Sequence, residues 1–61
     1  MRLDYRALFA SRLKQIRIDL NLTQQDVADT LDVSVRTVQL WESGKVFPSV
    51  KNYRKFNMFF D

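Results

Sequence analysis

The segment from Thr23 to Glu42 constrains the fold most, because it holds two short amphipathic helical patterns separated by a break at residues 31–34. Its apolar positions follow helical spacing and are Val27, Ala28 and Leu31 in the first helix and Val38 and Trp41 in the second. A break this short cannot let the second helix run parallel to the first, so the two must cross steeply. The small side chain of Ala28 lets them approach at the crossing point.

Capping residues mark where both helices of this pair begin. Thr23 can accept a hydrogen bond from the backbone of the first helix, and Asp26 three residues later approximates a capping box. Ser34 can cap the second helix in the same way, with Val33 on the inward side just before it. The pair is therefore predicted as a helix-turn-helix.

A longer helix is predicted before this pair, over residues 4–20, with Asp4 as its N-cap. Its residues expected to point inward are spaced by three or four and are Tyr5, Phe9, Leu13, Ile16 and Leu20. Asn21 can adopt the left-handed conformation that often ends a helix.

A fourth helix is predicted after Gly44, the only glycine, and a loop that ends at Pro48. Ser49 can cap it, and its residues expected to point inward are Val50, Tyr53 and either Phe56 or Asn57. The aromatic residues at the C-terminal end either extend this helix into the core or offer an exposed apolar surface to a second copy of the chain.

Chain length and composition predict a single all-α domain over residues 1–61, a small bundle of four to five helices. The chain has no cysteine and no histidine, so it lacks the usual parts of disulfide, zinc and nucleophilic sites. We expect no enzymatic activity, no cofactor, no metal and no small-molecule ligand. The longest apolar run is four residues, from Ala7 to Ala10, so we expect a soluble, cytoplasmic protein with no leader segment.

The net charge of +3 is unevenly distributed. Residues 1–22 and 35–61 each carry five basic against two acidic residues, whereas residues 23–34 carry three aspartates and no basic residue. If the aspartates face solvent, the flanking basic residues can present a positive surface to phosphates. The alternative is that the charges only keep the chain soluble.

The chain resembles the Xre/Cro-type helix-turn-helix domains of phage repressors from about Arg12 to Phe56. The residues that carry the resemblance, all at the family spacing, are Gln24, Ala28, Val38, the run Trp41-Glu42-Ser43-Gly44 and the pair Pro48-Ser49. The resemblance implies a lambda-repressor-like bundle of five helices whose third helix, here Val35 to Ser43, enters the major groove of DNA.

The second helix of the pair directs five side chains away from its inward stripe, namely Val35, Arg36, Thr37, Gln39 and Leu40. We expect these to contact bases, because arginine can pair with guanine and glutamine with adenine, whereas Val35 suits a thymine methyl group. Thr37 and Leu40 lie at the margin. Arg36 could instead bind a phosphate. Trp41 is expected in the core rather than as a base-stacking platform.

The resemblance also implies contacts to the DNA backbone. It assigns phosphate contacts to Arg17, Thr23, Gln24, Ser34, Ser43 and Lys45. Gln24 stands at a helix N-terminus, where the helix dipole favours an anion. Arg17 and Glu42 match an ion pair that joins the first helix to the end of the recognition helix, and this pair could equally serve the fold alone.

The chain departs from the family pattern in three ways. Asp32 stands at the turn where glycine is usual, although aspartate can adopt the left-handed conformation. Val35 cannot hydrogen-bond to Gln24, and the chain stops where a fifth helix should develop. A dimer interface must therefore use Phe59, Phe60 and nearby residues, or be absent.

These observations predict a sequence-specific regulator that binds a double-stranded DNA operator, most simply a repressor of phage, prophage or plasmid type with no room for an effector domain. We expect a homodimer on DNA and an inverted-repeat operator with half-sites about one helical turn apart. The alternative is a protein-interaction module, such as an antitoxin or scaffold, that uses the aromatic C-terminal tail.

Overall fold

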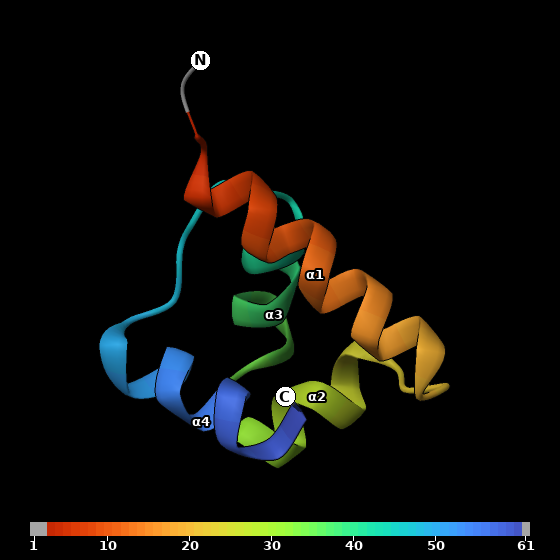
Figure 1. Ribbon diagram of the computed structural model, residues 1–61. Helices are drawn as coiled ribbons and strands as arrows, with labels where there is room; N and C mark the ends of the chain where they lie inside the picture. Colours follow the sequence, from red (N-terminus) through yellow and green to blue (C-terminus); the bar gives the residue numbers. More distant parts are fainter. Residues whose placement is uncertain (1–2, 61) are drawn as a thin grey trace.

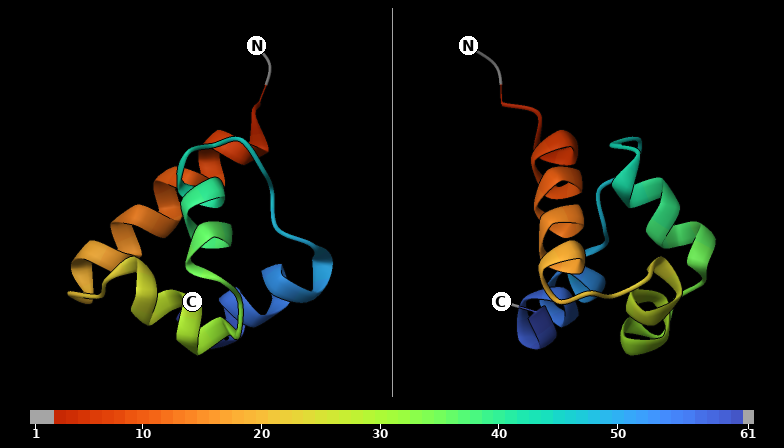
Figure 2. Two further views of the ribbon diagram at one scale, coloured as in Figure 1. Left: turned by 180° about the vertical axis from the view of Figure 1, so that it is seen from behind. Right: turned by 90° about the vertical axis from the view of Figure 1, so that its right-hand side faces the viewer.

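The computed structural model describes residues 3–60, and within that range it contains four helices and no strand. The helices are α1 (Tyr5–Asp19), α2 (Gln24–Leu31), α3 (Val35–Glu42) and α4 (Val50–Phe60) (Figure 1). Helix α3 packs against α1 and α2, and α4 lies beside α2 (Figure 2). The all-α prediction is confirmed with four helices, and the fifth helix that the resemblance implies does not occur between residues 3 and 60.

Local capping accounts for the start of α1 as predicted. The Asp4 carboxylate accepts hydrogen bonds from the backbone N–H groups of Arg6 at 3.0 Å and Ala7 at 3.4 Å. These donors, the Ala7 N–H first, hold the pKa of Asp4 below its usual value. At the other end of the helix, Asn21 has a φ of 57°, the left-handed conformation expected of it.

A complete capping box begins α2. The Thr23 hydroxyl accepts from the Asp26 N–H at 3.0 Å, and the Asp26 carboxylate accepts from the Thr23 N–H at 2.9 Å. The hydrogen bond from the Thr23 backbone is the main reason that the pKa of Asp26 is lowered. The capping box therefore satisfies two backbone donors at this helix end within four residues.

The turn between α2 and α3 depends on Asp32, which adopts the left-handed conformation with φ 56° and ψ 50°. The next residue, Val33, donates its N–H to the carbonyl of Ala28 at 3.0 Å. Ser34 then caps α3 by accepting from the Thr37 N–H at 3.1 Å. The turn therefore forms with aspartate where the family usually has glycine, as predicted.

The core lies between the four helices and takes buried residues from each of them. The predicted crossing residues are buried, with Ala28 and Val38 at 0% exposure and Trp41 at 2%. Phe9 of α1 lies at the centre of an aromatic cluster, with ring centroids 5.0 Å from Phe56 and 6.0 Å from Trp41. This confirms that Trp41 belongs to the core.

Three residues predicted to point inward are exposed instead: Tyr5 at 65%, Leu20 at 55% and Val50 at 70%. Helical spacing gives the face of a helix but not the length over which a neighbour covers it. Tyr5 is the first residue of α1, Val50 is the first residue of α4, and Leu20 follows the last residue of α1. Ala10, which the stripe did not include, is buried.

The C-terminal aromatics divide between the core and the surface. Helix α4 extends to Phe60, with Phe56 fully buried and Phe60 packed against the core, whereas Met58 and Phe59 are exposed. A further link, not predicted from the sequence, comes from Lys55, whose ammonium donates to the Leu31 carbonyl at 2.9 Å. A cation at the carboxyl end of α2 complements its dipole and ties α4 to the helix pair.

Among residues 3–60, no helix combines the length and apolarity that crossing a membrane requires. The same residues contain no group of three or more histidine, cysteine or carboxylate side chains placed to hold a metal ion.

Candidate DNA interface

Of the five residues of α3 predicted to contact bases, two are exposed, and Val35, Thr37 and Leu40 are half-buried. Arg36 and Gln39 are exposed, and within residues 3–60 neither side chain has a hydrogen bond or ion pair. Leu40 is half-buried beside them. Arg36 and Gln39 lie three residues apart and so share one side of the helix. Their guanidinium and amide groups are therefore available to an external partner.

The start of α3 is more engaged with the protein itself. Val35 is half-buried and packs against the core, so only part of its side chain faces outward. The hydroxyls of Ser34 and Thr37 form a hydrogen bond of 2.9 Å with each other. These three residues help to fix the start of the helix. Their predicted DNA contacts would use the parts of their side chains that remain exposed.

The predicted ion pair between Arg17 and Glu42 is present and bidentate. Arg17 Nε lies 2.7 Å from Glu42 Oε2, and Arg17 Nη2 lies 3.0 Å from Glu42 Oε1. The Glu42 side chain is 4% exposed and that of Arg17 is 21% exposed. The hydrogen bonds to Glu42 raise the pKa of Arg17 above its usual value. A third donor, Arg17 Nη1, reaches the Leu22 carbonyl at 3.2 Å, so this arginine joins α1, the α1–α2 loop and α3.

Gln24 belongs to the same network, which the sequence did not indicate. Its Nε2 donates to Glu42 Oε1 at 3.2 Å, across 18 residues of sequence. An amide nitrogen carries two hydrogens, so one remains free for a phosphate. Glu42 therefore holds both Arg17 and Gln24, and it fixes the side of Gln24 from which the amide donates.

The carboxyl end of α3 carries the other predicted phosphate contacts. The Ser43 hydroxyl donates to the Leu40 carbonyl at 2.7 Å and accepts weakly from the Lys45 N–H at 3.4 Å. The Lys45 side chain is exposed and has no partner in the described part of the chain. Thr23, at the start of α2, keeps its hydroxyl hydrogen because it accepts in the capping box.

Taken together, these positions lie near the two ends of α3. Arg17, Gln24 and Glu42 join into one cluster, and Lys45 follows the carboxyl end of the helix. Thr23 lies next to this cluster in sequence, whereas Ser34 lies at the opposite end of α3. The result is an exposed helix face that carries unpaired donors, with cationic or amide donors at its edges, which is the arrangement that major-groove binding uses.

Comparisons with known proteins agree with this geometry. A family model described as helix-turn-helix matches residues 13–61. The HTH-type transcriptional activator BcrR of Enterococcus faecalis is 38% identical over 52 residues, which are 85% of this chain and 26% of that protein. The chain thus spans about a quarter of this relative. No solved structure matches the chain significantly. The chain belongs to the Xre-type helix-turn-helix family of DNA-binding transcription regulators.

Proposed function

We propose that the chain recognises a specific double-stranded DNA sequence by placing α3 in the major groove. The observation that carries this proposal is the outer face of α3, where Arg36 and Gln39 are exposed and unpaired within residues 3–60. Both side chains can form bidentate hydrogen bonds with purine edges. Val35, Thr37 and Leu40 would add apolar and hydroxyl contacts at the margins.

Backbone contacts would fix the register of α3 on the duplex. Gln24 and Arg17 are held in place by Glu42, so they can meet a phosphate with little loss of side-chain entropy. Lys45 would supply a charge just beyond the carboxyl end of α3, with Thr23, Ser34 and Ser43 as hydroxyl contacts. These contacts would give affinity to any sequence, and the base contacts would give preference for one.

We further propose repression by occupancy of an inverted repeat. A bound domain can exclude polymerase without other contacts, and a two-fold dimer would place its recognition helices about 34 to 36 Å apart. The exposed Phe59 and the half-buried Phe60 would contribute to the dimer contact. The relative is named an activator, and about three quarters of it lie outside the match.

Selection of bound sites tests the proposal. The protein is incubated with random-sequence duplex DNA at two salt concentrations, bound DNA is separated by gel shift, and the selection is repeated. We expect binding to weaken steeply with salt because counterions are released, and an inverted repeat to be enriched. Binding without enrichment of any sequence would contradict sequence-specific recognition.

The second candidate is a protein-interaction module, favoured by Met58 at 74% and Phe59 at 55% exposure on α4. An aromatic protein interface should hold or strengthen as salt rises, whereas DNA binding should weaken.

Sedimentation of the wild type and of Phe59→Ser would test the dimer. We expect the variant to dissociate at concentrations where the wild type is dimeric, and equal association of both would exclude this residue from the contact.

A further inference from the structure

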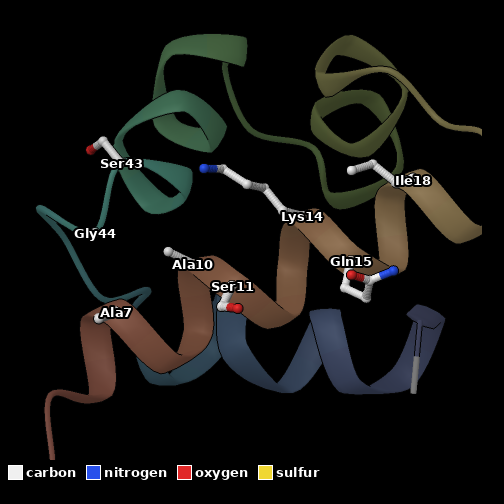
Figure 3. Close-up of a pocket in the computed structure, with 8 residues that line it drawn as sticks. All are labelled: Ala7, Ala10, Ser11, Lys14, Gln15, Ile18, Ser43 and Gly44. Carbon is white, nitrogen blue, oxygen red and sulfur yellow. The ribbon is translucent and has the colours of Figure 1, made fainter.

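A cleft of about 410 Å³ lies between α1 and the carboxyl end of α3 (Figure 3). None of its lining residues is acidic, and they are Ala7, Ala10, Ser11, Lys14, Gln15, Ile18, Ser43 and Gly44. The small side chains of Ala7 and Ala10 leave the space open between the two helices. The cleft can therefore admit an anionic group.

Two of the lining residues present donors with no partner inside the protein. Lys14 extends across the cleft toward α3 (Figure 3), and neither it nor Ser11 has a side-chain hydrogen bond or ion pair within residues 3–60. By contrast, Gln15 donates to Asp19 at 2.8 Å, and Ser43 donates to a backbone carbonyl at 2.7 Å. Ser11 and Lys14 are three residues apart, so an ammonium and a hydroxyl lie on the same side of α1.

The cleft continues the candidate DNA interface. Arg36, Gln39 and Ser43 follow one another by three and four residues along α3, and Ser43 lines the cleft. On the other side, Lys14 is one helical turn before Arg17, which is in the network with Gln24 through Glu42. The cleft thus adjoins the proposed base-contacting face through Ser43 and the cluster proposed to bind phosphate through Lys14.

We propose that this cleft seats a backbone phosphate of duplex DNA, held by the Lys14 ammonium with the Ser11 hydroxyl as a second donor. The proposal rests on the DNA-binding function above and adds a contact from α1. Because every nucleotide carries the same phosphate, the contact raises affinity for all sequences and adds no preference among them.

The test compares Lys14→Gln with a matched loss of charge, Arg54→Gln, at an exposed position of α4 outside the cleft. Affinities are measured on random and on selected duplexes. Loss of one phosphate contact should reduce the slope of log affinity against log salt by about 0.9, so the deficit of Lys14→Gln should shrink about threefold between about 50 and 200 mM salt. The deficit should be equal on both duplexes, Lys14→Arg should restore the slope, and Arg54→Gln should change it less.

Thermal unfolding separates this role from a structural one. An ammonium near the last carbonyls of α3 can also stabilise that helix through its dipole. A lower melting temperature for Lys14→Gln with an unchanged salt slope would show this role and overturn the phosphate site. A wild-type slope for Lys14→Gln on both duplexes would overturn it as well. If the wild type bound no DNA at all, the proposed function would be wrong and the phosphate site with it. This result can be told apart from the two above, in which the wild type binds DNA.

Discussion

The two faces of α3 differ in almost every physical respect, although the helix has only eight residues. Its inner face is buried, with Val38 at 0%, Trp41 at 2% and Glu42 at 5% exposure. Its outer face carries Arg36 and Gln39, which are exposed and make no side-chain hydrogen bond within residues 3–60. On the proposed function, folding and recognition therefore depend on different residues of one helix, and substitutions should change one property without the other.

Glu42 is the exception, because it is buried and yet holds two residues proposed to contact DNA. Its carboxylate accepts from Arg17 and from Gln24, so it connects the core to the edge of the interface. Changes at Glu42 should thus affect both stability and backbone contacts, whereas changes at Trp41 or Arg36 should affect mainly one.

A substitution on the inner face of α3 should lower stability the most. Trp41→Ala removes a buried indole that packs against Phe9, and we expect a loss of about 3 to 5 kcal/mol in the free energy of unfolding. Such a loss is enough to unfold a domain of this size. Circular dichroism during urea unfolding would measure it, with the conservative Trp41→Phe expected to lose less. A native-like midpoint for Trp41→Ala would break the contrast between the two faces.

At the junction, Glu42→Ala should cost about 2 to 3 kcal/mol, because it leaves the mostly buried Arg17 without its carboxylate. Glu42→Gln keeps one acceptor and should lose less. The same urea titrations would rank the variants. If Glu42→Ala were as stable as the wild type, the network would contribute nothing to the fold.

Substitution by glycine at the turn between α2 and α3 should have a smaller effect, and it should raise stability rather than lower it. Asp32 has a φ of 56°, a conformation that glycine adopts without strain. Asp32→Gly should therefore gain about 1 kcal/mol, and Asp32→Ala should lose stability. Thermal melts of the two variants would test this. A loss of stability on substitution by glycine would mean that the aspartate side chain does more than tolerate the turn.

The smallest expected effect is a pH dependence at the start of α2. The capping box lowers the pKa of Asp26 below its value in the unfolded chain, which is about 3.9. The resulting stabilisation is therefore fully present above the unfolded pKa and is lost as the pH falls through the folded pKa. Asp26→Asn should flatten this part of the stability curve. Melting temperatures between about pH 2 and 6 would show it, and identical pH profiles for both proteins would argue against the capping role.

Features set by neighbouring residues could be predicted from the sequence. The capping box needs only Thr23 and Asp26, and the crossing of α2 and α3 follows from the spacing of Ala28 and Val38. The burial of residues at the helix ends was less predictable, as the exposed Tyr5 shows, because periodicity does not reveal how far a neighbouring helix extends.

Contacts between distant residues could not be predicted from local patterns, and the ion pair between Arg17 and Glu42 was expected only through the family resemblance. The bond from Gln24 to Glu42 spans 18 residues and that from Lys55 to Leu31 spans 24. Each depends on how whole helices are placed, and no local pattern encodes it. The candidate site follows the same division: its exposed residues follow from helical spacing, whereas the support beneath Gln24 does not.

The most direct test of the central claim compares the wild type with Arg36→Ala and Gln39→Ala for both stability and selected DNA sequence. Both variants should unfold within about 0.5 kcal/mol of the wild type, since neither side chain has an internal partner among residues 3–60. Each should lose about 1 to 3 kcal/mol of discrimination at one base position of the operator. Equal weakening on every sequence, or a large loss of stability, would contradict the claim that this face of α3 reads bases independently of the fold.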